Sequence, residues 1–310
     1  MAVVIDGRET ARKKREEAAL RAAALKKRGI LPRLAVILVG EDPASLSYVA
    51  GKEKALAGAG MESRDIRLPA DTPEEELLSL IAGLNADPSV HGILVQLPLP
   101  GHIGEDRIIT AIDPAKDVDG FHPVSAGNLV LGRPGFLPCT PRGILVLLEE
   151  AGIPTRGAHA VIVGRSAIVG RPLAILLARR DINATVTVCH TGSGELGRYT
   201  RQADILIAAA GKPGLITADM VKEGAAVIDV GVNRTPVFPP GPGNGAPPAP
   251  ENAAGKSYRL RGDVDYEGVA KKAGWITPVP GGVGPMTIAM LLLNLIQAAE
   301  AAVPGGAAKA

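Results

Sequence analysis

The 310-residue chain has few aromatic residues and no marked excess of charge of either sign. Only 3% of its residues are aromatic, so the placement of each of its four tyrosines is unusually informative. Lysine plus arginine total 34 against 32 aspartate plus glutamate, which gives a formal net charge of +2. Because nucleic-acid binding depends on a strongly basic surface, this balance argues against a nucleic-acid partner.

The chain also has little cysteine and no obvious targeting segment. Its two cysteines, Cys139 and Cys189, form neither a CxxC motif nor a disulfide framework, and no metal site is expected. As small buried residues they suit a reducing compartment. The apolar run at the N-terminus is too short for a signal peptide, and no later run approaches membrane-spanning length. We therefore expect a cytoplasmic protein with no membrane partner.

The first half of the chain alternates apolar strands with helices. A charged amphipathic helix is predicted from about Arg8 to Arg28. In "DTPEEELLSLIAGLN", Thr72 is predicted to cap a helix, with Pro73 in its first turn and Glu75 completing a capping box. Such continuous apolar strands between helices predict a mostly parallel sheet covered on both faces. The strands are expected at residues 34–40, 64–69 and 91–100.

The second half repeats this pattern as a Rossmann-like, doubly wound parallel sheet. The stretch "HAVIVGRSAIVGRPLAILLARR", residues 159–180, predicts a strand, a glycine-rich turn and a helix. Residues 236–256 are rich in proline and glycine and predict a surface loop. The last helix is expected from about Thr287 to Ala301, before a disordered tail. The fold class is therefore α/β, with two α/β domains and an active site in the cleft between them. We assign residues 1–139 plus 286–310 to the first domain and 140–285 to the second.

The turn from Gly164 to Gly170 could bring backbone N–H groups and a helix dipole against a pyrophosphate. The usual G-x-G-x-x-G spacing is absent, so an ordinary tight turn remains the alternative. The next strand ends at Cys189-His190-Thr191, without the acid that commonly holds the ribose 2′-hydroxyl of NAD. Instead, Arg165 stands in the turn and could bind a 2′-phosphate, which favours NADP. His190 could contact the phosphate or serve a structural role.

A tyrosine and a lysine, Tyr48 and Lys52, lie four residues apart in a predicted helix. At this spacing both side chains lie on one face, one turn apart, and could point into the same cleft. The alternative is a packed ring with the lysine ammonium extended to the surface above it.

Six separated stretches share their pattern with one family: "SYVAGKEKA", "VQLPLP", "KDVDGFHP", "PCTPRGI", "GRSAIVGRP" and "PVPGGVGPMT". Together they closely resemble the bifunctional methylenetetrahydrofolate dehydrogenase/methenyltetrahydrofolate cyclohydrolase family. The resemblance covers essentially the whole chain except the proline-rich loop and the tail. It implies a homodimer that uses NADP to oxidise 5,10-methylenetetrahydrofolate and then hydrolyses the methenyl product to 10-formyltetrahydrofolate. It also makes the first domain the folate-binding, catalytic domain and the second the NADP-binding domain.

The resemblance also implies roles for individual residues. Tyr48 would pack on the folate, Lys52 would drive ring opening, Gln96 would hydrogen-bond to that lysine, and Asp119 would bind the pterin. A carboxylate suits the neighbouring N–H donors of a pterin, but Asp117 is equally acidic, and only the resemblance selects Asp119. The further positions implied are a folate-side loop at Pro280, Gly281 and Gly282, and an adenosine-phosphate site at Arg165, Ser166 and Thr191.

Two rival hypotheses fit part of the pattern. In a short-chain dehydrogenase, Tyr48 would be the catalytic acid and Lys52 would tune it, but there the glycine-rich turn precedes the pair, whereas here Gly164 follows it. A non-catalytic sensor of NADP or folate could keep the fold without turnover. The presence of every polar residue that the family chemistry requires argues against the sensor.

Overall fold

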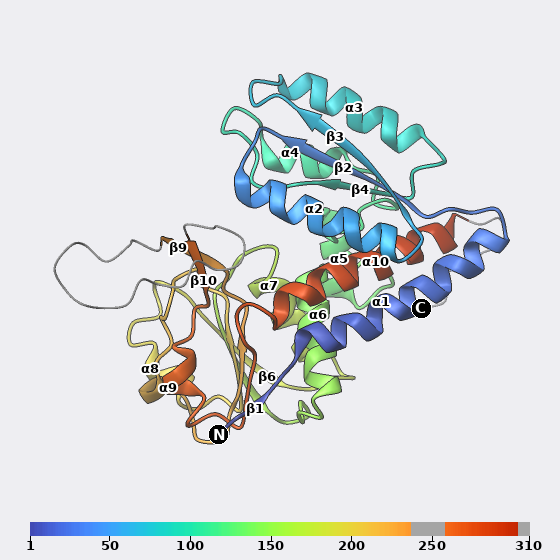
Figure 1. The fold of residues 1–310 in the computed structure, drawn as a ribbon. Helices are drawn as coiled ribbons and strands as arrows, with labels where there is room; N and C mark the ends of the chain where they lie inside the picture. The colour runs from blue at the N-terminus through green and yellow to red at the C-terminus, as the bar shows by residue number, and fades with distance from the viewer. Residues whose placement is uncertain (237–257, 303–310) are drawn as a thin grey trace, which may run out of the picture.

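The computed structural model describes residues 1–236 and 258–302, so most of the predicted proline-rich loop and the tail lie outside the described residues. It contains a three-stranded and a six-stranded parallel sheet, each accompanied by helices (Figure 1). The prediction of an α/β fold with a parallel nucleotide-binding-type sheet is confirmed.

The smaller sheet has the strand order β3-β2-β4, and all of its pairs are parallel. Successive residues of β2 face opposite sides: Leu34 and Val36 join the core shared with α2, whereas Ala35 and Ile37 pack with α3 and α4. Helices therefore cover both faces, as the continuous apolar strands predict. The elements are β2 (Arg33–Val39), α2 (Pro43–Gly58), β3 (Glu62–Leu68), α3 (Glu74–Ala86), β4 (Gly92–Val95), α4 (Glu105–Ala111) and α5 (Pro123–Leu131).

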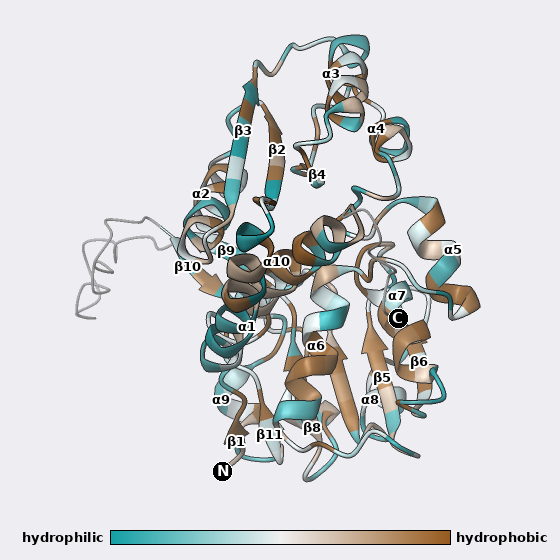
Figure 2. Cartoon of the chain, turned by 90° about the vertical axis from the view of Figure 1, so that its right-hand side faces the viewer, coloured by the Kyte–Doolittle hydropathy of each residue, from teal (hydrophilic) through white to brown (hydrophobic). Residues whose placement is uncertain are grey.

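The larger sheet has the order β1-β11-β8-β7-β5-β6, again all parallel. One of its two edge strands, β1, comes from the N-terminus, and no sequence pattern predicts its pairing with β11. Figure 2 shows the hydrophobic residues on its strands and the hydrophilic residues along α1. The elements of this part are β1 (Val3–Val4), α1 (Gly7–Lys27), α6 (Cys139–Glu150), β5 (His159–Val163), α7 (Gly170–Ala178), β6 (Thr185–Cys189), α8 (Gly197–Thr200), β7 (Ile205–Ala208), η1 (Ala218–Met220), β8 (Ala226–Asp229), α9 (Tyr266–Val269) and β11 (Trp275–Ile276). Strands β9 (Asn233–Pro236) and β10 (Tyr258–Arg261) pair with each other antiparallel in a separate two-stranded sheet.

Helix α10 (Val283–Ala301) packs against α1, α2 and α6, and one hydrophobic core runs from the smaller sheet through this helix to the larger sheet. It begins four residues before the predicted start at Thr287, because Pro285 lies in the first turn, where its missing N–H is not needed. The helix is long and apolar enough to cross a membrane by length and composition, which corrects the expectation that no run approaches that length. Because it is mostly buried inside the protein, we interpret it as a core helix.

The predicted capping box at the start of α3 is wrong. The helix begins at Glu74, and Pro73 occupies the cap position without a side-chain hydrogen bond. The hydroxyl of Thr72 turns back and donates to the carbonyl of Pro69 at 2.8 Å. The Thr72 hydroxyl therefore bonds to the preceding turn, and the first N–H groups of α3 have no side-chain cap.

Candidate functional site

The structure brings Tyr48 and Lys52 together on α2. Lys52 is only 5% exposed, and its Nζ lies 5.3 Å from the centroid of the Tyr48 ring. The same Nζ donates to Oε1 of Gln96 at 3.0 Å. The alternative of an ammonium extended to the surface is therefore wrong, since the charged end of this lysine is the part that is buried.

Gln96 directly follows β4, at the carboxyl end of a strand, where parallel sheets commonly bind ligands. Its Nε2 donates to the carbonyl of Leu97 at 2.7 Å, and this hydrogen bond orients the amide so that Oε1 faces Lys52. The amide oxygen is thus oriented toward Lys52 by the backbone of the same segment.

The electrostatics of this cluster differ from those of a surface lysine. Burial lowers the pKa of Lys52, while the nearby Asp119 and Cys139 act in the opposite direction. Burial likewise raises the pKa of Asp119, and the Lys52 charge partly offsets this. Desolvation dominates both groups, so the amine loses its proton more readily than an exposed lysine does.

The two candidate aspartates have different surroundings. The carboxylate of Asp117 accepts hydrogen bonds from the backbone N–H groups of Phe121 (3.1 Å) and His122 (2.9 Å) and from the hydroxyl of Ser125 (2.7 Å). It therefore closes the turn that leads into α5. Asp119 is only partly buried and lies near Lys52; desolvation raises its pKa, and a hydrogen bond with the Cys139 thiol lowers it.

Sequence reasoning missed the residues that anchor Tyr48. Its ring is partly exposed, whereas burial raises the pKa of its phenol and a hydrogen bond with Thr287 lowers it. The Thr287 hydroxyl lies 2.8 Å from that of Thr140, so α10 and α6 meet at this point. Both threonines lie within stretches that resemble the family, and this resemblance was the one feature of the sequence that could have pointed to them.

The predicted folate-side loop leads into α10. Gly281 and Gly282 are buried, Gly281 has a φ of +121°, and Pro280 is exposed. A Cβ added to Gly7 would lie 1.8 Å from the carbonyl oxygen of Gly282. The start of α1 therefore packs directly on this loop and holds it beside the helix that carries Thr287.

The glycine-rich turn closes tightly after β5. Gly164 has a φ of +132°, and a Cβ on it would lie 2.1 Å from the carbonyl oxygen of Ala209. A Cβ on Gly170 would lie 2.2 Å from the carbonyl oxygen of Gly164, so both positions require glycine. The Ser166 hydroxyl accepts hydrogen bonds from the N–H groups of Val169 (3.2 Å) and Gly170 (3.4 Å), which helps to cap α7.

The end of β6 lies beside this turn, since the Gly164 N–H donates to the carbonyl of Cys189 at 2.9 Å. Nδ1 of His190 accepts from the Gly192 N–H at 3.1 Å, which gives this ring a structural contact. Arg165 and Thr191 are exposed, and within the described residues Arg165 forms no ion pair. The turn thus presents a free guanidinium and a hydroxyl at the carboxyl edge of the sheet.

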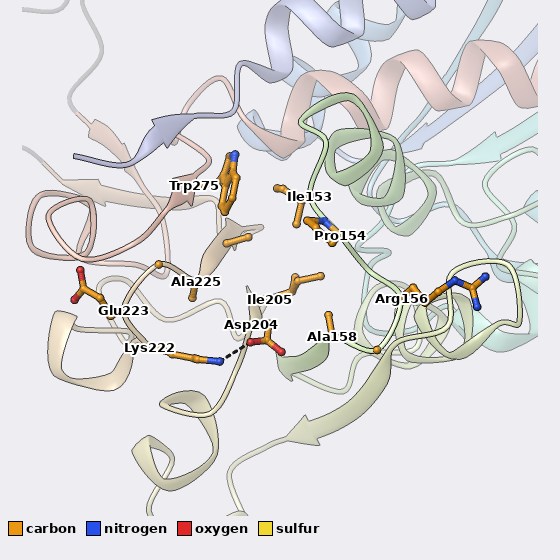
Figure 3. Close-up of a pocket in the computed structure, with 13 residues that line it drawn as sticks. Ile153, Pro154, Arg156, Ala158, Asp204, Ile205, Lys222, Glu223, Ala225 and Trp275 are labelled. Carbon is orange, nitrogen blue, oxygen red and sulfur yellow. Dashed lines mark hydrogen bonds and ion pairs between the residues drawn. The ribbon is translucent and has the colours of Figure 1, made fainter.

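A cavity of about 460 Å³ lies at the opposite edge of the larger sheet, around Trp275 (Figure 3). None of the predicted site residues lines it. Its central charged pair, Asp204 and Lys222, is joined in an ion pair, so neither charge is left for a ligand. This cavity lies near the amino ends of β7 and β8, whereas open parallel sheets bind ligands beyond the carboxyl ends of their strands.

The two parallel sheets, the glycine-rich turn and the buried lysine together define a two-part, nucleotide-binding α/β enzyme. The chain belongs to the tetrahydrofolate dehydrogenase/cyclohydrolase family. Residues 5–119 match the model of its catalytic domain, and residues 138–303 match the model of its NAD(P)-binding domain.

Similar proteins cover nearly the whole chain. A relative from Exiguobacterium sibiricum named bifunctional protein FolD is 57% identical over 300 residues, which are 97% of this chain and 100% of the relative. The crystal structure of the bifunctional FolD enzyme from Campylobacter jejuni has a TM-score of 0.89 and 48% identity, and the match covers 98% of this chain and 100% of that one. The Trypanosoma brucei FolD, solved with NADP and an inhibitor, has a TM-score of 0.88 and 38% identity, with 97% and 98% covered.

Proposed function

We propose that this protein oxidises 5,10-methylenetetrahydrofolate with NADP and hydrolyses the resulting 5,10-methenyltetrahydrofolate to 10-formyltetrahydrofolate. The observation that carries the proposal is the buried contact between Lys52 Nζ and Gln96 Oε1 beside the Tyr48 ring. It places a proton-transferring amine next to a ring that can stack on a planar ligand. The name of the Campylobacter jejuni enzyme, which gives both the dehydrogenase and the cyclohydrolase activity, supports this assignment.

In this proposal, residues 1–139 plus 286–310 form the folate side and residues 140–285 form the cofactor side, with the active site between them. The two family models meet near the proposed boundary, one ending at 119 and the next beginning at 138, but the NAD(P)-binding model runs to 303 and so includes α10. Strand β1 also pairs with β11 of the larger sheet, so the first residues of the chain reach the cofactor side. Because α10 packs on α1 and α2 as well as on α6, it can link the two sides.

The first reaction depends on positioning. NADP, when bound, supplies the acceptor for the hydride that leaves the methylene carbon. The chain then has to hold folate and nicotinamide in register, because the product cation is stabilised by its own nitrogen. Tyr48 would stack on the folate and Asp119 would accept hydrogen bonds from the pterin. The residues proposed to hold the cofactor are Gly164, Arg165, Ser166, Gly170, His190 and Thr191.

The residues of the glycine-rich turn fit NADP better than NAD. Arg165 is exposed and free of ion pairs among the described residues, so its guanidinium can donate two hydrogen bonds to the oxygens of a 2′-phosphate. The end of β6 has no carboxylate that would hold a 2′-hydroxyl and repel that phosphate.

The second reaction needs proton transfer at the attacking water. Lys52 would act as a neutral amine, since burial already lowers its pKa and a bound methenyl cation would lower it further. Gln96 holds the amine in place through its oriented Oε1.

We also propose a homodimer that forms through α5, α7 and β6. Strand β6 is an edge of the larger sheet, and Val130 and Leu131 of α5 are 63% and 62% exposed. An apolar groove beside them includes Ile175 and Val188, so a second copy could cover both the groove and the open edge. Sedimentation of the wild type and of Val130→Glu tests this: we expect dimers for the former and monomers for the latter.

An absorbance assay tests the proposed function. Methylenetetrahydrofolate is mixed with the enzyme and with either NADP or NAD, and the reduced cofactor and the methenyl product are followed separately. We expect reduced cofactor with NADP and only transient methenyl product. Binding of either ligand without turnover would support the sensor hypothesis instead.

A further inference from the structure

We infer that Asn294 is a positioning residue that holds the backbone on which Asp119 is carried. This inference rests on the proposed role of Asp119 in folate binding and extends it to a residue in the middle of α10. Asn294 is a single amide in the otherwise apolar run "MLLLNLI" and is fully buried, with 0% of it exposed. A buried polar side chain in such a helix needs hydrogen-bond partners.

Asn294 finds these partners next to the folate site. Its Nδ2 donates to the carbonyl of Val118 at 2.7 Å and to the carbonyl of Leu137 at 3.0 Å. Val118 immediately precedes Asp119, and the Cys139 thiol donates to the same Val118 carbonyl at 3.5 Å. The Asn294 side chain thus hydrogen-bonds to two segments that both precede α6, one at Val118 and one at Leu137.

Arg142 of α6 sets the direction in which this amide points. Its Nη1 donates to Oδ1 of Asn294 at 2.6 Å, and a guanidinium offers donors only. The amide oxygen must therefore face Arg142, which turns the NH₂ group toward Val118 and Leu137. Within the described residues, Arg142 forms no ion pair, so this amide oxygen is an important partner for a partly buried charge.

The two segments tied by Asn294 also touch each other directly. Gly120, which follows Asp119, has a φ of +74°, and a Cβ on it would lie 2.7 Å from the nitrogen of Pro138. The turn that carries Asp119 therefore lies flat against the Leu137–Pro138 peptide. If the Asn294 hydrogen bonds are lost, both sides of this contact are released together.

The same helix positions Tyr48. Thr287, which anchors the Tyr48 phenol, precedes Asn294 by seven residues, which is two turns and hence the same face of α10. This face meets α6, where Thr140 and Arg142 are the polar partners. The contact between α6 and α10 thus places both the stacking ring and the carboxylate of the folate site.

The test compares Asn294→Asp and Asn294→Leu with Leu292→Ala. The Asp variant keeps an acceptor for Arg142 but loses the donors to Val118, Leu137 and the Cys139 sulfur, whereas the Leu variant loses all four hydrogen bonds of the side chain. Leu292 is equally buried on α10 but has no polar group, so it controls for lost packing. We expect both Asn294 variants to raise the KM for methylenetetrahydrofolate about 10- to 100-fold, with the KM for NADP changed less than about 2-fold. Leu292→Ala should also lose thermal stability, as the Asn294 variants do. Its KM values for methylenetetrahydrofolate and for NADP should nevertheless stay at those of the wild type.

A second measurement does not depend on turnover. Amide hydrogen exchange of the segment 116–122 should accelerate in both Asn294 variants and not in Leu292→Ala, while exchange of the turn at 164–170 stays unchanged. Equal KM increases in all three variants, or unchanged exchange at 116–122, would overturn the positioning role. If the wild type fails to turn over methylenetetrahydrofolate, the proposed function is wrong, and the exchange experiment still decides whether Asn294 holds this segment.

Discussion

Replacing Lys52 by Met should separate the two proposed reactions. The variant removes the hydrogen bond to Gln96 Oε1 at 3.0 Å and the cation 5.3 Å from the Tyr48 ring, but keeps an unbranched side chain. Loss of a general acid/base lowers a rate by about 10²-fold or more, which corresponds to about 2.7 kcal/mol of transition-state stabilisation. We expect the cyclohydrolase activity to fall by at least this factor.

The dehydrogenase activity should fall much less. A buried cation over a ring contributes about 2 kcal/mol, and the thioether of the new Met recovers about 0.3 to 1.5 kcal/mol through its own contact with Tyr48. The net loss in ring placement is then about 1 kcal/mol, or roughly 5-fold in rate. Gln96 keeps its orientation, because its Nε2 still donates to Leu97.

The assay follows reduced cofactor and methenyl product in the same reaction, with Lys54→Met as the matched control. Lys54 lies on the same helix but is exposed, so its replacement should leave both activities unchanged. Methenyl product should accumulate only in the Lys52 variant. Equal loss of both activities in Lys52→Met, with folate binding retained, would show that the lysine positions folate for both steps, and our assignment would be wrong.

Four further substitutions test other parts of the molecule. Arg165→Ala should weaken NADP binding by about 1.5 to 3 kcal/mol and NAD binding far less, as measured by titration; equal losses would make the arginine part of the turn's structure. Asp119→Ala should raise the KM for folate at nearly unchanged thermal stability. Asp117→Ala should instead lower the free energy of unfolding by about 2 to 3 kcal/mol, because three donors lose their acceptor; identical phenotypes would contradict this division. Burial raises the pKa of Asp229 to about 6 from 3.8, so the folded state holds this proton more tightly than the unfolded state. Its contribution to stability is therefore present at low pH and is lost, by up to about 3 kcal/mol, as the pH rises from about 4 to 6. Unfolding across this range should show the loss in the wild type and not in Asp229→Asn, and parallel pH profiles would refute it.

Local patterns were enough to predict the type of fold. The apolar runs at residues 34–40 and 159–163 predict buried parallel strands, since each alternates with an amphipathic helix, and both strands form close to those bounds. The spacing of Tyr48 and Lys52 likewise predicts a shared face, because helix geometry depends only on the separation along the chain. The prediction of a capping box was wrong because the Thr72 hydroxyl had two possible partners close in sequence. It bonds to the carbonyl of Pro69 instead of capping α3.

The roles within the site depend on long-range packing. The sequence could not rank Asp117 against Asp119; the difference arises because the Asp117 carboxylate meets the backbone of the following turn. Nor could it predict that Asn294 would reach Val118, which lies 176 residues earlier in the chain. Periodicity and propensity describe residues a few positions apart, and they report which side chains face a core. Which buried polar groups meet there is decided when α10 packs against α6, because each donor must then find an acceptor within hydrogen-bonding distance.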